Sequence, residues 1–277
     1  MYERYITAKS RQFFAFNIWN IESAKAVLDA AAEQRQDVII QTSMKAFSLI
    51  DKEELRFFAT NYAGNRGIKA YLHLDHCKRM DYIEEALKYK WDSVMIDASE
   101  QCLDENIRIT NEVCLLAKAK NVMVEAEVGQ INGVEDDISA TEVGIARIED
   151  VEKFIKETDV DMLAVAVGTA HGLYKGMPHL HYDLIGEIQK KTDIPIVVHG
   201  GTGLTDGMFL KLLSYDNIKK VNISTDVKLA YRQGVQKAYQ EGILEKDEFD
   251  PLKVTDYIHK EIKDMVMTKM ELLKING

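Results

Sequence analysis

The chain has 277 residues, of which 46% are hydrophobic, and carries a formal net charge of −10 at pH 7. This length fits one α/β barrel or two smaller domains, and because the chain has only 3 prolines and no Ser/Gly-rich linker, we expect a single domain over residues 1–277. The negative charge argues against a protein that grips nucleic acid or an anionic membrane, although a positive pocket can still hold a small anion.

Eight short runs rich in Val, Ile, Phe and Ala recur along the chain. Most are nearly continuous in apolar residues, as is typical of parallel strands covered by helices. The predicted strands are residues 13–18, 37–43, 69–76, 93–99, 122–128, 162–169, 194–201 and 220–225. Helical spacing of apolar residues predicts helices at residues 20–34, 51–65, 80–90, 104–120, 148–158, 183–192 and 206–214, and a last one at 257–273.

The spacing from strand to strand is mostly that of one βα unit. We therefore expect an α/β fold, a (β/α)8 TIM barrel with a C-terminal helical extension. The longer interval after the fifth strand predicts an enlarged loop at residues 129–144. An open doubly wound sheet is the alternative architecture.

The amino terminus has no apolar signal core, and no run of 18 apolar residues occurs. Cys77, Cys102 and Cys114 are odd in number and lack CxxC spacing, which fits reduced thiols. We therefore expect a cytoplasmic protein.

Polar and ionisable residues gather at the carboxyl ends of the predicted strands. A single Asp or Ser there is usually a helix cap, but a full rim of such residues indicates an active site, because barrels carry their chemistry at this end. The rim residues are Asn17, Ser43, Asp75, His76, Asp97, Ser99, Glu127, His171, His199, Asn222, Ser224 and Thr225.

Three of these residues are histidines on separate strands, His76, His171 and His199. Their neutral imidazoles can converge on one Zn²⁺ ion and leave it an open coordination position, as a catalytic zinc requires. His73 lies two residues before Asp75 and is expected deeper in the barrel on the same side. A regular strand would place His73 and His76 on opposite faces, which argues against a zinc hydrolase built on an inward His-x-His pair.

Glycines follow the sixth and seventh predicted strands, in "AHGLYKG" and "HGGTGL". Glycine lets backbone N–H groups turn toward a ligand, and barrels often bind phosphate in the loops after strands seven and eight. The glycines therefore favour a phosphorylated substrate beside the metal.

With these motifs in order, the sequence resembles the class II, zinc-dependent ketose-bisphosphate aldolases, which include the fructose-1,6-bisphosphate and tagatose-1,6-bisphosphate aldolases. The matching runs are FNIWN, HLDHC, MIDASE, VEAEVG, GVEDD, AVAVGTAHGLYKG, VVHGGTGL and KVNIST. The resemblance covers nearly the whole chain. It implies reversible aldol cleavage of a ketose phosphate to dihydroxyacetone phosphate and an aldehyde.

The resemblance also implies a role for each matching residue. The zinc ligands would be His76, His171 and His199, with Asp97 and Glu127 orienting ligands or holding a second cation. The catalytic residues would be Asp75 as the acid/base for the C4 hydroxyl, Glu135 as the base for the carbon-bound proton, and Asn222. Residues that line the pocket or hold the phosphate would be Asn17, Ser43, Gly172, Lys175, Gly200, Thr202, Ser224 and Thr225, with Na⁺ or K⁺ nearby.

Two departures leave the substrate open. Leu252, in "DPLK", stands where many relatives have an arginine associated with the far phosphate, and Ser224 occupies a position that varies between fructose-type and tagatose-type enzymes. The alternatives are an aldolase of this family that acts on another or a singly phosphorylated sugar, and a non-catalytic sugar-phosphate-binding relative. The expected partners are a small sugar phosphate and further copies of the chain in a homodimer or homotetramer, with no nucleic acid and no membrane.

Overall fold

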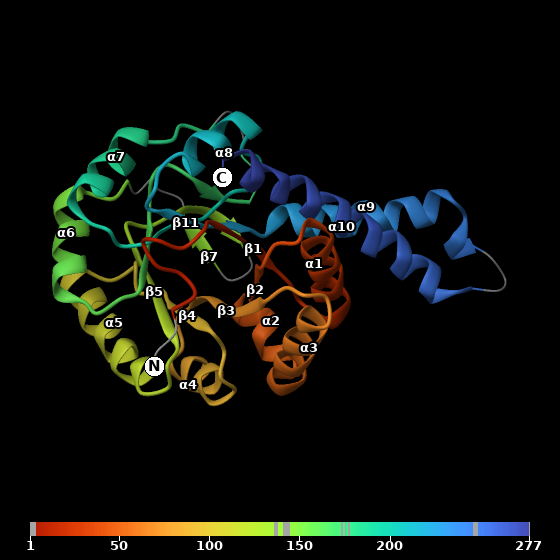
Figure 1. Cartoon of the computed structure of the whole chain (residues 1–277), viewed down its shortest axis with the longest axis horizontal. Coiled ribbons are helices and arrows are strands. Elements are labelled where there is room, and N and C mark those ends of the chain that lie inside the picture. The colour runs from red at the N-terminus through yellow and green to blue at the C-terminus, as the bar shows by residue number, and fades with distance from the viewer. Residues whose placement is uncertain are drawn as a thin grey trace.

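Eight parallel strands close into a barrel in the computed structural model, which describes residues 4–135, 138–140, 145–172, 174, 176, 178–245 and 249–276 (Figure 1). The barrel strands are β1 (Phe13–Asn17), β2 (Val38–Thr42), β3 (Ala70–Cys77), β4 (Ser93–Ile96), β5 (Met123–Val128), β8 (Met162–Val165), β10 (Ile196–Val198) and β11 (Ile218–Ile223). The ring closes where β1 pairs with β11. The expected TIM barrel is confirmed, and the open sheet is excluded.

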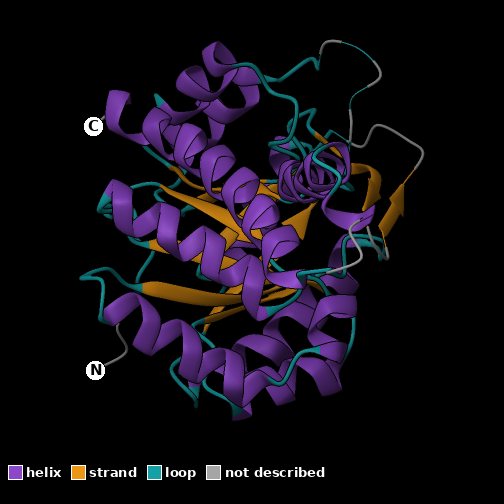
Figure 2. Cartoon of the chain, turned by 90° about the vertical axis from the view of Figure 1, so that its right-hand side faces the viewer, coloured by secondary structure: helices purple, strands orange, loops and turns teal. Residues whose placement is uncertain are grey.

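Helices connect the strands and cover the barrel from outside (Figure 2). They are α1 (Ile21–Gln34), α2 (Met44–Leu49), α3 (Lys52–Gly64), α4 (Met80–Lys88), α5 (Leu103–Lys118), α6 (Ile148–Glu157), α7 (Tyr182–Lys191), α8 (Asp206–Leu213), α9 (Thr225–Gln240) and α10 (Pro251–Asn276), with a short 3₁₀ turn, η1 (Ile243–Glu245). The spacing of apolar residues did not predict α2, which is short, or α9, whose buried face consists of Val227 and the small residues Ala230, Gly234 and Ala238. No helix within the described ranges is both long and apolar enough to cross a membrane.

The segment after β5, expected to be an enlarged loop, forms a small sheet of its own. Strand β6 (Asn132–Glu135) pairs antiparallel with β7 (Ile138–Ala140) and parallel with β9 (Ala170–His171). Gly133 pairs with His171 in this register. The sheet therefore joins the segment that carries Glu135 to the strand that carries one of the expected metal ligands.

The barrel interior is filled with apolar side chains at its amino-terminal end. Phe13, Met95 and Met162 are buried there, and the amino-terminal segment adds Tyr5. The Tyr5 ring stacks on Tyr71 with centroids 4.1 Å apart, and its hydroxyl lies 2.6 Å from Ser93 Oγ. Burial raises the pKa of Tyr5 well above its usual value. This packing closes one end of the barrel, so a substrate reaches the interior only from the other end.

Helices α9 and α10 form a hairpin that projects beyond the barrel (Figure 1). They cross at Gly234, where an added Cβ would lie 2.4 Å from Ile258 Cα and 2.7 Å from Ile258 N. These atoms belong to the backbone of α10 and cannot turn away. The close approach of the two helices therefore depends on glycine at this position.

We expect Gly234→Ala to lower the free energy of unfolding by about 1–3 kcal/mol, because the methyl group forces the two helices apart. Gly207→Ala is the matched control, since an added Cβ at Gly207 meets no atom within 4 Å and a helical glycine is replaced by a better helix former. Urea unfolding followed by circular dichroism measures both changes. Equal stability of the two variants would contradict the close crossing.

Candidate active site

An extra residue in β3 shapes the mouth of the barrel. Leu74 pairs with Val94 and Cys77 with Ile96. Between these two pairs β3 advances by three residues and β4 by two, so β3 contains one extra residue. The backbone of His76 takes a left-handed conformation, with φ of 45°. This bulge turns Asp75 and His76 into the mouth together, where both are buried, although adjacent residues of a regular strand point to opposite faces.

The bulge also overturns the expectation that His73 and His76 lie on opposite faces. His76 Nε2 lies 2.7 Å from His199 Nδ1, and the other ring nitrogen of His199 lies 2.8 Å from Glu125. Glu125 in turn lies 3.5 Å from His73 Nε2. Both histidines therefore face the barrel interior, His76 at the mouth and His73 below it.

The three expected metal ligands converge. His76 ends β3, His171 ends β9 and His199 follows β10, and one ring nitrogen of each lies within 4.8 Å of the others. All three side chains are buried. Because three imidazoles from separate strands meet with nitrogens facing one another, the residues can hold a metal ion such as zinc.

Two carboxylates lie beside this cluster. Asp97 Oδ2 lies 2.9 Å from His76 Nδ1, and Asp97 Oδ1 accepts a hydrogen bond from Ser99 Oγ at 2.7 Å. Glu127 Oε1 accepts from the backbone N–H of Ile131, whereas Oε2 has no hydrogen-bond donor within the described part of the chain. Asp97 therefore orients His76 toward the cluster, and Glu127 offers a carboxylate oxygen to a cation.

The pKa shifts show that the cluster attracts positive charge. Burial lowers the pKa of His76, but Asp75, Asp97 and Glu127 outweigh it and raise the pKa to about 10. Burial and the neighbouring Asp97 raise the pKa of Glu127 to about 8. Since protons are retained where several carboxylates are buried together, a divalent cation fits this set of ligands in their place.

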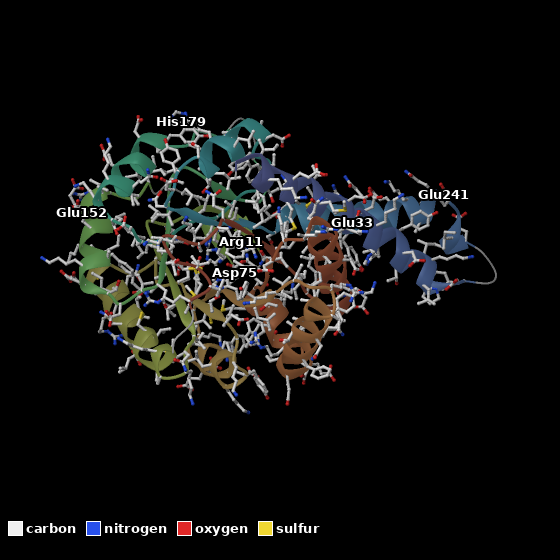
Figure 3. The ribbon with its side chains drawn as sticks, in the orientation of Figure 1. Arg11, Glu33, Asp75, Glu152, His179 and Glu241 are labelled. Carbon is white, nitrogen blue, oxygen red and sulfur yellow. The ribbon has the colours of Figure 1, made fainter. Side chains whose placement is uncertain are left out.

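Asp75 is held by three side-chain amides. Its Oδ2 accepts hydrogen bonds from Asn17 Nδ2 at 3.0 Å and Gln41 Nε2 at 3.1 Å, and its Oδ1 accepts from Asn222 Nδ2 at 3.2 Å. Gln41 also donates to Asn17 Oδ1 at 2.7 Å. Asp75 lies within the ring of strands in Figure 3. The amides come from three strands and fix the carboxylate beside the histidine cluster.

Three of the expected phosphate-binding residues, Thr202, Ser224 and Thr225, lie at the start of α9. Thr202 Oγ1 accepts from the backbone N–H of Asp226 at 3.1 Å, and Ser224 Oγ is buried without a partner in the described ranges. Thr225 is the first residue of α9. Helix amino termini favour anions, so this corner of the mouth suits a phosphate group.

The close packing of the loop after β10 requires glycine. Gly200 has φ of 69°, and a Cβ there would lie 2.3 Å from the carbonyl oxygen of Ala170. Gly172 also has a positive φ, of 84°. Gly200 therefore lets the loop after β10 lie close to β9.

Three expected residues have other outcomes. Ser43 Oγ accepts from the backbone N–H of Ala46 and caps α2, as strand-end serines usually do. Lys175 lies outside the described residues. The backbone of Glu135 ends β6, but its side chain lies outside what the structure describes.

Comparison with known proteins decides the family. The family model described as "Fructose-bisphosphate aldolase class-II" matches residues 4–277. The chain belongs to the class-II fructose-bisphosphate aldolase family. It is therefore an aldolase, a carbon–carbon lyase of a family that is generally metal dependent.

Individual relatives of this aldolase agree with the family match. Fructose-bisphosphate aldolase from Helicobacter pylori strain 26695 is 33% identical over 94% of this chain and 92% of its own, and that from strain J99 is 32% identical with the same coverage. The YdjI aldolase from Escherichia coli K12 superposes with a TM-score of 0.80 at 25% identity over 96% of this chain and 93% of its own. Fructose-bisphosphate aldolase from Campylobacter jejuni, at 22% identity over 95% and 90% of the two chains, shares the fold with a TM-score of 0.78.

Three further polar residues of this aldolase, Gln41, Glu125 and Lys220, are buried inside predicted strands and were not predicted as site residues. Gln41 holds Asp75, while Glu125 bonds to His199 and to Lys220. Each lies two residues before a predicted rim residue, Gln41 before Ser43, Glu125 before Glu127 and Lys220 before Asn222, and the alternation of side chains along a strand was the signal that could have found them.

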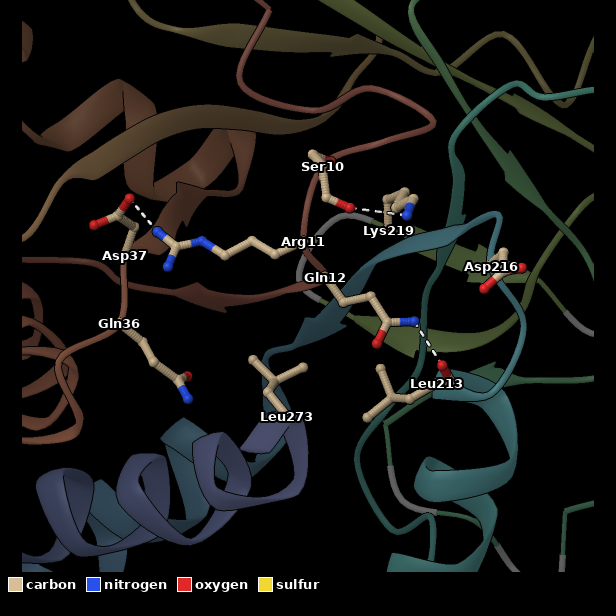
Figure 4. A pocket seen from close by; sticks show the side chains of 9 residues that line it. All are labelled: Ser10, Arg11, Gln12, Gln36, Asp37, Leu213, Asp216, Lys219 and Leu273. Atoms are coloured by element: carbon tan, nitrogen blue, oxygen red, sulfur yellow. Dashed lines mark hydrogen bonds and ion pairs between the residues drawn. The ribbon is translucent and has the colours of Figure 1, made fainter. Parts of the chain in front are cut away.

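A cavity at the opposite end of the barrel carries no comparable chemistry (Figure 4). Arg11 forms an ion pair with Asp37, and Lys219 Nζ donates to the carbonyl oxygen of Ser10 at 2.8 Å. Gln12 Nε2 donates to backbone carbonyls, including that of Leu213 at 2.7 Å. These groups hold together the segments that precede the strands, so we assign the cavity a structural role.

We expect Gln41→Ala to lower kcat of the aldol reaction by about 10- to 100-fold, because Asp75 loses one of the donors that orient it and a hydrogen bond to a charged group contributes about 1.5–3 kcal/mol. Gln34→Ala is the control. Gln34 is a buried glutamine that accepts from Lys274 Nζ at 2.5 Å, on the outside of the barrel. Steady-state kinetics measures both variants, and a Gln41→Ala enzyme with unchanged kcat would show that this amide does not position Asp75.

Proposed function

We propose that this chain is a zinc-dependent aldolase, a single domain over residues 1–277, that reversibly cleaves a ketose bisphosphate to dihydroxyacetone phosphate and glyceraldehyde 3-phosphate. The substrate in this proposal is fructose 1,6-bisphosphate or tagatose 1,6-bisphosphate. The observation that carries it is the juxtaposition of a buried, amide-held carboxylate, Asp75, with three converging imidazoles. A base beside a metal-binding cluster is what aldol cleavage needs.

The proposed metal ligands are His76, His171 and His199, and Glu127 offers a further oxygen. Imidazole ligands suit zinc, and neutral ligands leave the ion its full charge. When bound, zinc supplies a Lewis acid that stabilises the negative charge developing on the substrate's carbonyl oxygen as the C–C bond breaks.

Asp75 is the proposed base for the C4 hydroxyl. Its carboxylate accepts the hydroxyl proton during cleavage and returns it to the aldehyde oxygen during condensation. The amides of Asn17, Gln41 and Asn222 hold both carboxylate oxygens, so the group meets the substrate in one orientation. Lys220, which also faces the barrel interior, is bound to Glu125 and has no exposed side-chain surface, so it is not placed to form a Schiff base with a ketone.

A second base is needed for the proton on carbon. Glu135 is proposed for this role, because the backbone of β6 runs beside β9, which ends at His171. Asn222 is proposed to steady the enediolate of dihydroxyacetone phosphate. Its amide oxygen is buried and has no partner within the described residues, although its amide nitrogen is bound to Asp75.

The phosphate of dihydroxyacetone phosphate is proposed to bind at the amino terminus of α9. The backbone around Gly172 and Gly200 and the hydroxyls of Thr202, Ser224 and Thr225 support this placement. Lys175 and a monovalent cation, Na⁺ or K⁺, complete the proposed site. In this scheme Asn17 affects the substrate indirectly, because it holds Asp75. Ser43 contributes by capping the start of α2.

The far end of the substrate is the open part of the proposal. Leu252 is the second residue of α10, at the outer end of the helical hairpin, and its side chain is 71% exposed. It therefore lies away from the mouth of its own barrel and brings no positive charge to a second phosphate.

We also propose that the hairpin is covered by another copy of the chain in a homodimer or homotetramer. Light scattering in solution would reveal the oligomer.

The test of the function is metal removal combined with Asp75→Asn. Dialysis against a chelator is expected to abolish cleavage of both ketose bisphosphates, and one equivalent of zinc to restore it. Asp75→Asn is expected to lower kcat by about 10²- to 10⁴-fold, because the base is lost, while zinc content stays unchanged.

Asp51→Asn serves as the matched control, since Asp51 caps α3 on the surface and asparagine is an equally good cap. Full activity of the metal-free enzyme would refute the zinc mechanism. Full turnover of Asp75→Asn would refute the role of Asp75.

A screen of aldehydes tests the substrate. Dihydroxyacetone phosphate is condensed with glyceraldehyde 3-phosphate and with unphosphorylated glyceraldehyde, and kcat/KM is compared. We expect a preference of about tenfold or more for the phosphorylated aldehyde if a bisphosphate is the substrate, since one charge-assisted contact contributes about 1.5–3 kcal/mol. Equal values would favour a singly phosphorylated sugar, in keeping with the uncharged Leu252.

A further inference from the structure

A layer of buried charge lies directly beneath the proposed metal ligands. Glu125 Oε1 lies 2.8 Å from His199 Nε2, and Glu125 Oε2 lies 2.7 Å from Lys220 Nζ. His73 Nε2 is 3.5 Å from the same Oε2. None of these four side chains has any exposed surface. Water therefore neither solvates nor screens this ion pair.

Stability alone does not account for the layer. A buried ion pair costs several kcal/mol of desolvation per ion, and apolar residues of similar size are often as good or better for stability. The interior below it is mostly apolar, with Phe13 and Met162, and its polar contacts are those of Ser93 with His73 Nδ1 and the Tyr5 hydroxyl. A fully buried ion pair at the level of Glu125 and Lys220 points to a role in the site above it.

The layer is in register with the candidate active site. Three of its members lie two residues before a site residue on the same strand: His73 before Asp75, Glu125 before Glu127, and Lys220 before Asn222. Because side chains alternate along a strand, each member lies directly below that site residue. The ion pair is thus placed to act on the metal ligands from below.

Glu125 fixes which nitrogen of His199 faces the metal site. An ionised carboxylate only accepts hydrogen bonds, so His199 Nε2 must carry the proton that it shares with Glu125. The neutral ring then has its lone pair on Nδ1, the nitrogen that lies 2.7 Å from His76 Nε2 within the cluster. A carboxylate behind a ligating histidine orients the ring and makes it a stronger ligand.

Lys220 fixes Glu125. Its ammonium group has only donors and holds Oε2, which leaves Oε1 directed at His199. Its positive charge also balances the carboxylate, so the layer adds no net charge below the site.

We propose that Glu125 and Lys220 are positioning residues that hold His199 as an Nδ1 ligand and thereby strengthen metal binding. This inference rests on the proposed zinc-dependent function. It assigns Glu125 a direct hydrogen bond to a metal ligand, and it has Lys220 act only through Glu125.

Zinc affinity of purified variants, measured by competition with a chelating dye, tests the proposal. Glu125→Gln is expected to bind zinc about 10- to 100-fold more weakly, the usual cost of losing the carboxylate behind a ligand. The absorption bands of the Co²⁺-loaded variant are expected to shift, because the ring of His199 changes its orientation. Lys220→Met is expected to weaken zinc binding as well, since Glu125 is no longer held against His199.

The double variant Glu125→Gln/Lys220→Met tests whether Lys220 acts through Glu125. Its zinc affinity is expected to equal that of Glu125→Gln within about twofold, because the two residues form one unit. Fully additive losses would overturn this coupling. Arg56→Met and Asp92→Asn are the controls, since this ion pair lies away from the mouth, before β4, and should leave zinc affinity unchanged.

A purely structural role predicts a different outcome. Glu125→Gln would then melt at a lower temperature, while the folded protein kept its zinc affinity and Co²⁺ spectrum, and the proposal would be wrong. If the unmutated protein itself bound no zinc, the proposed function would fail instead. Zinc binding and activity in the unmutated protein, together with unchanged affinity in Glu125→Gln, would refute only the positioning role.

A measurement on the unmutated protein keeps the proposal testable even if the Glu125 and Lys220 variants do not fold. In metal-free protein labelled with ¹⁵N-histidine, the His199 ring, assigned by comparison with His199→Gln, is expected to be protonated on Nε2 and unprotonated on Nδ1. Addition of zinc is expected to shift the Nδ1 resonance. A proton on Nδ1, or a zinc-induced shift confined to Nε2, would overturn the proposal.

Discussion

The site depends on one extra residue in β3. A regular strand can present either Asp75 or His76 to the barrel mouth, but the bulge and the left-handed backbone at His76 present both. The proposed base and one of the proposed metal ligands are thereby adjacent residues in the chain. His171 and His199 can only complete a cluster around His76 because the bulge has brought its ring to the same side of the strand.

The barrel interior is arranged in levels with different chemistry. At the mouth lie the amide-held Asp75 and the histidine cluster, below them the ion pair of Glu125 and Lys220, and at the closed end an apolar layer sealed by Tyr5. Alternation along the strands keeps these levels in register, so that His73, Glu125 and Lys220 lie two positions before Asp75, Glu127 and Asn222 on the same strands. The strands of the barrel therefore carry Asp75, the amides that hold it and the ion pair below them.

Much of this arrangement could be predicted from the sequence, because long apolar runs and strand-end polar residues are strong signals. The strands, their order and the three histidines followed from these patterns. The orientation of His76 could not be predicted, because the bulge depends on one backbone torsion that the residue type at this position does not indicate. The sequence gives only a weak signal for Gln41, Glu125 and Lys220, because each is an isolated polar residue within an apolar run. Such a residue indicates a site only when it lies two positions before a polar residue at the strand end. The buried stripe of α9 consists of Val227 and the small residues Ala230, Gly234 and Ala238, which fit against α10 but give a weak apolar signal in the sequence.

The left-handed torsion at His76 also bears on how such an enzyme can change over time. A non-glycine residue held in this conformation costs on the order of 1–3 kcal/mol, which the surrounding barrel must offset. Replacement by glycine or asparagine would relieve that strain while destroying the cluster. At this position, therefore, a substitution that raises the stability of the fold lowers the activity. Selection for catalysis must retain His76 although its backbone conformation is unfavourable.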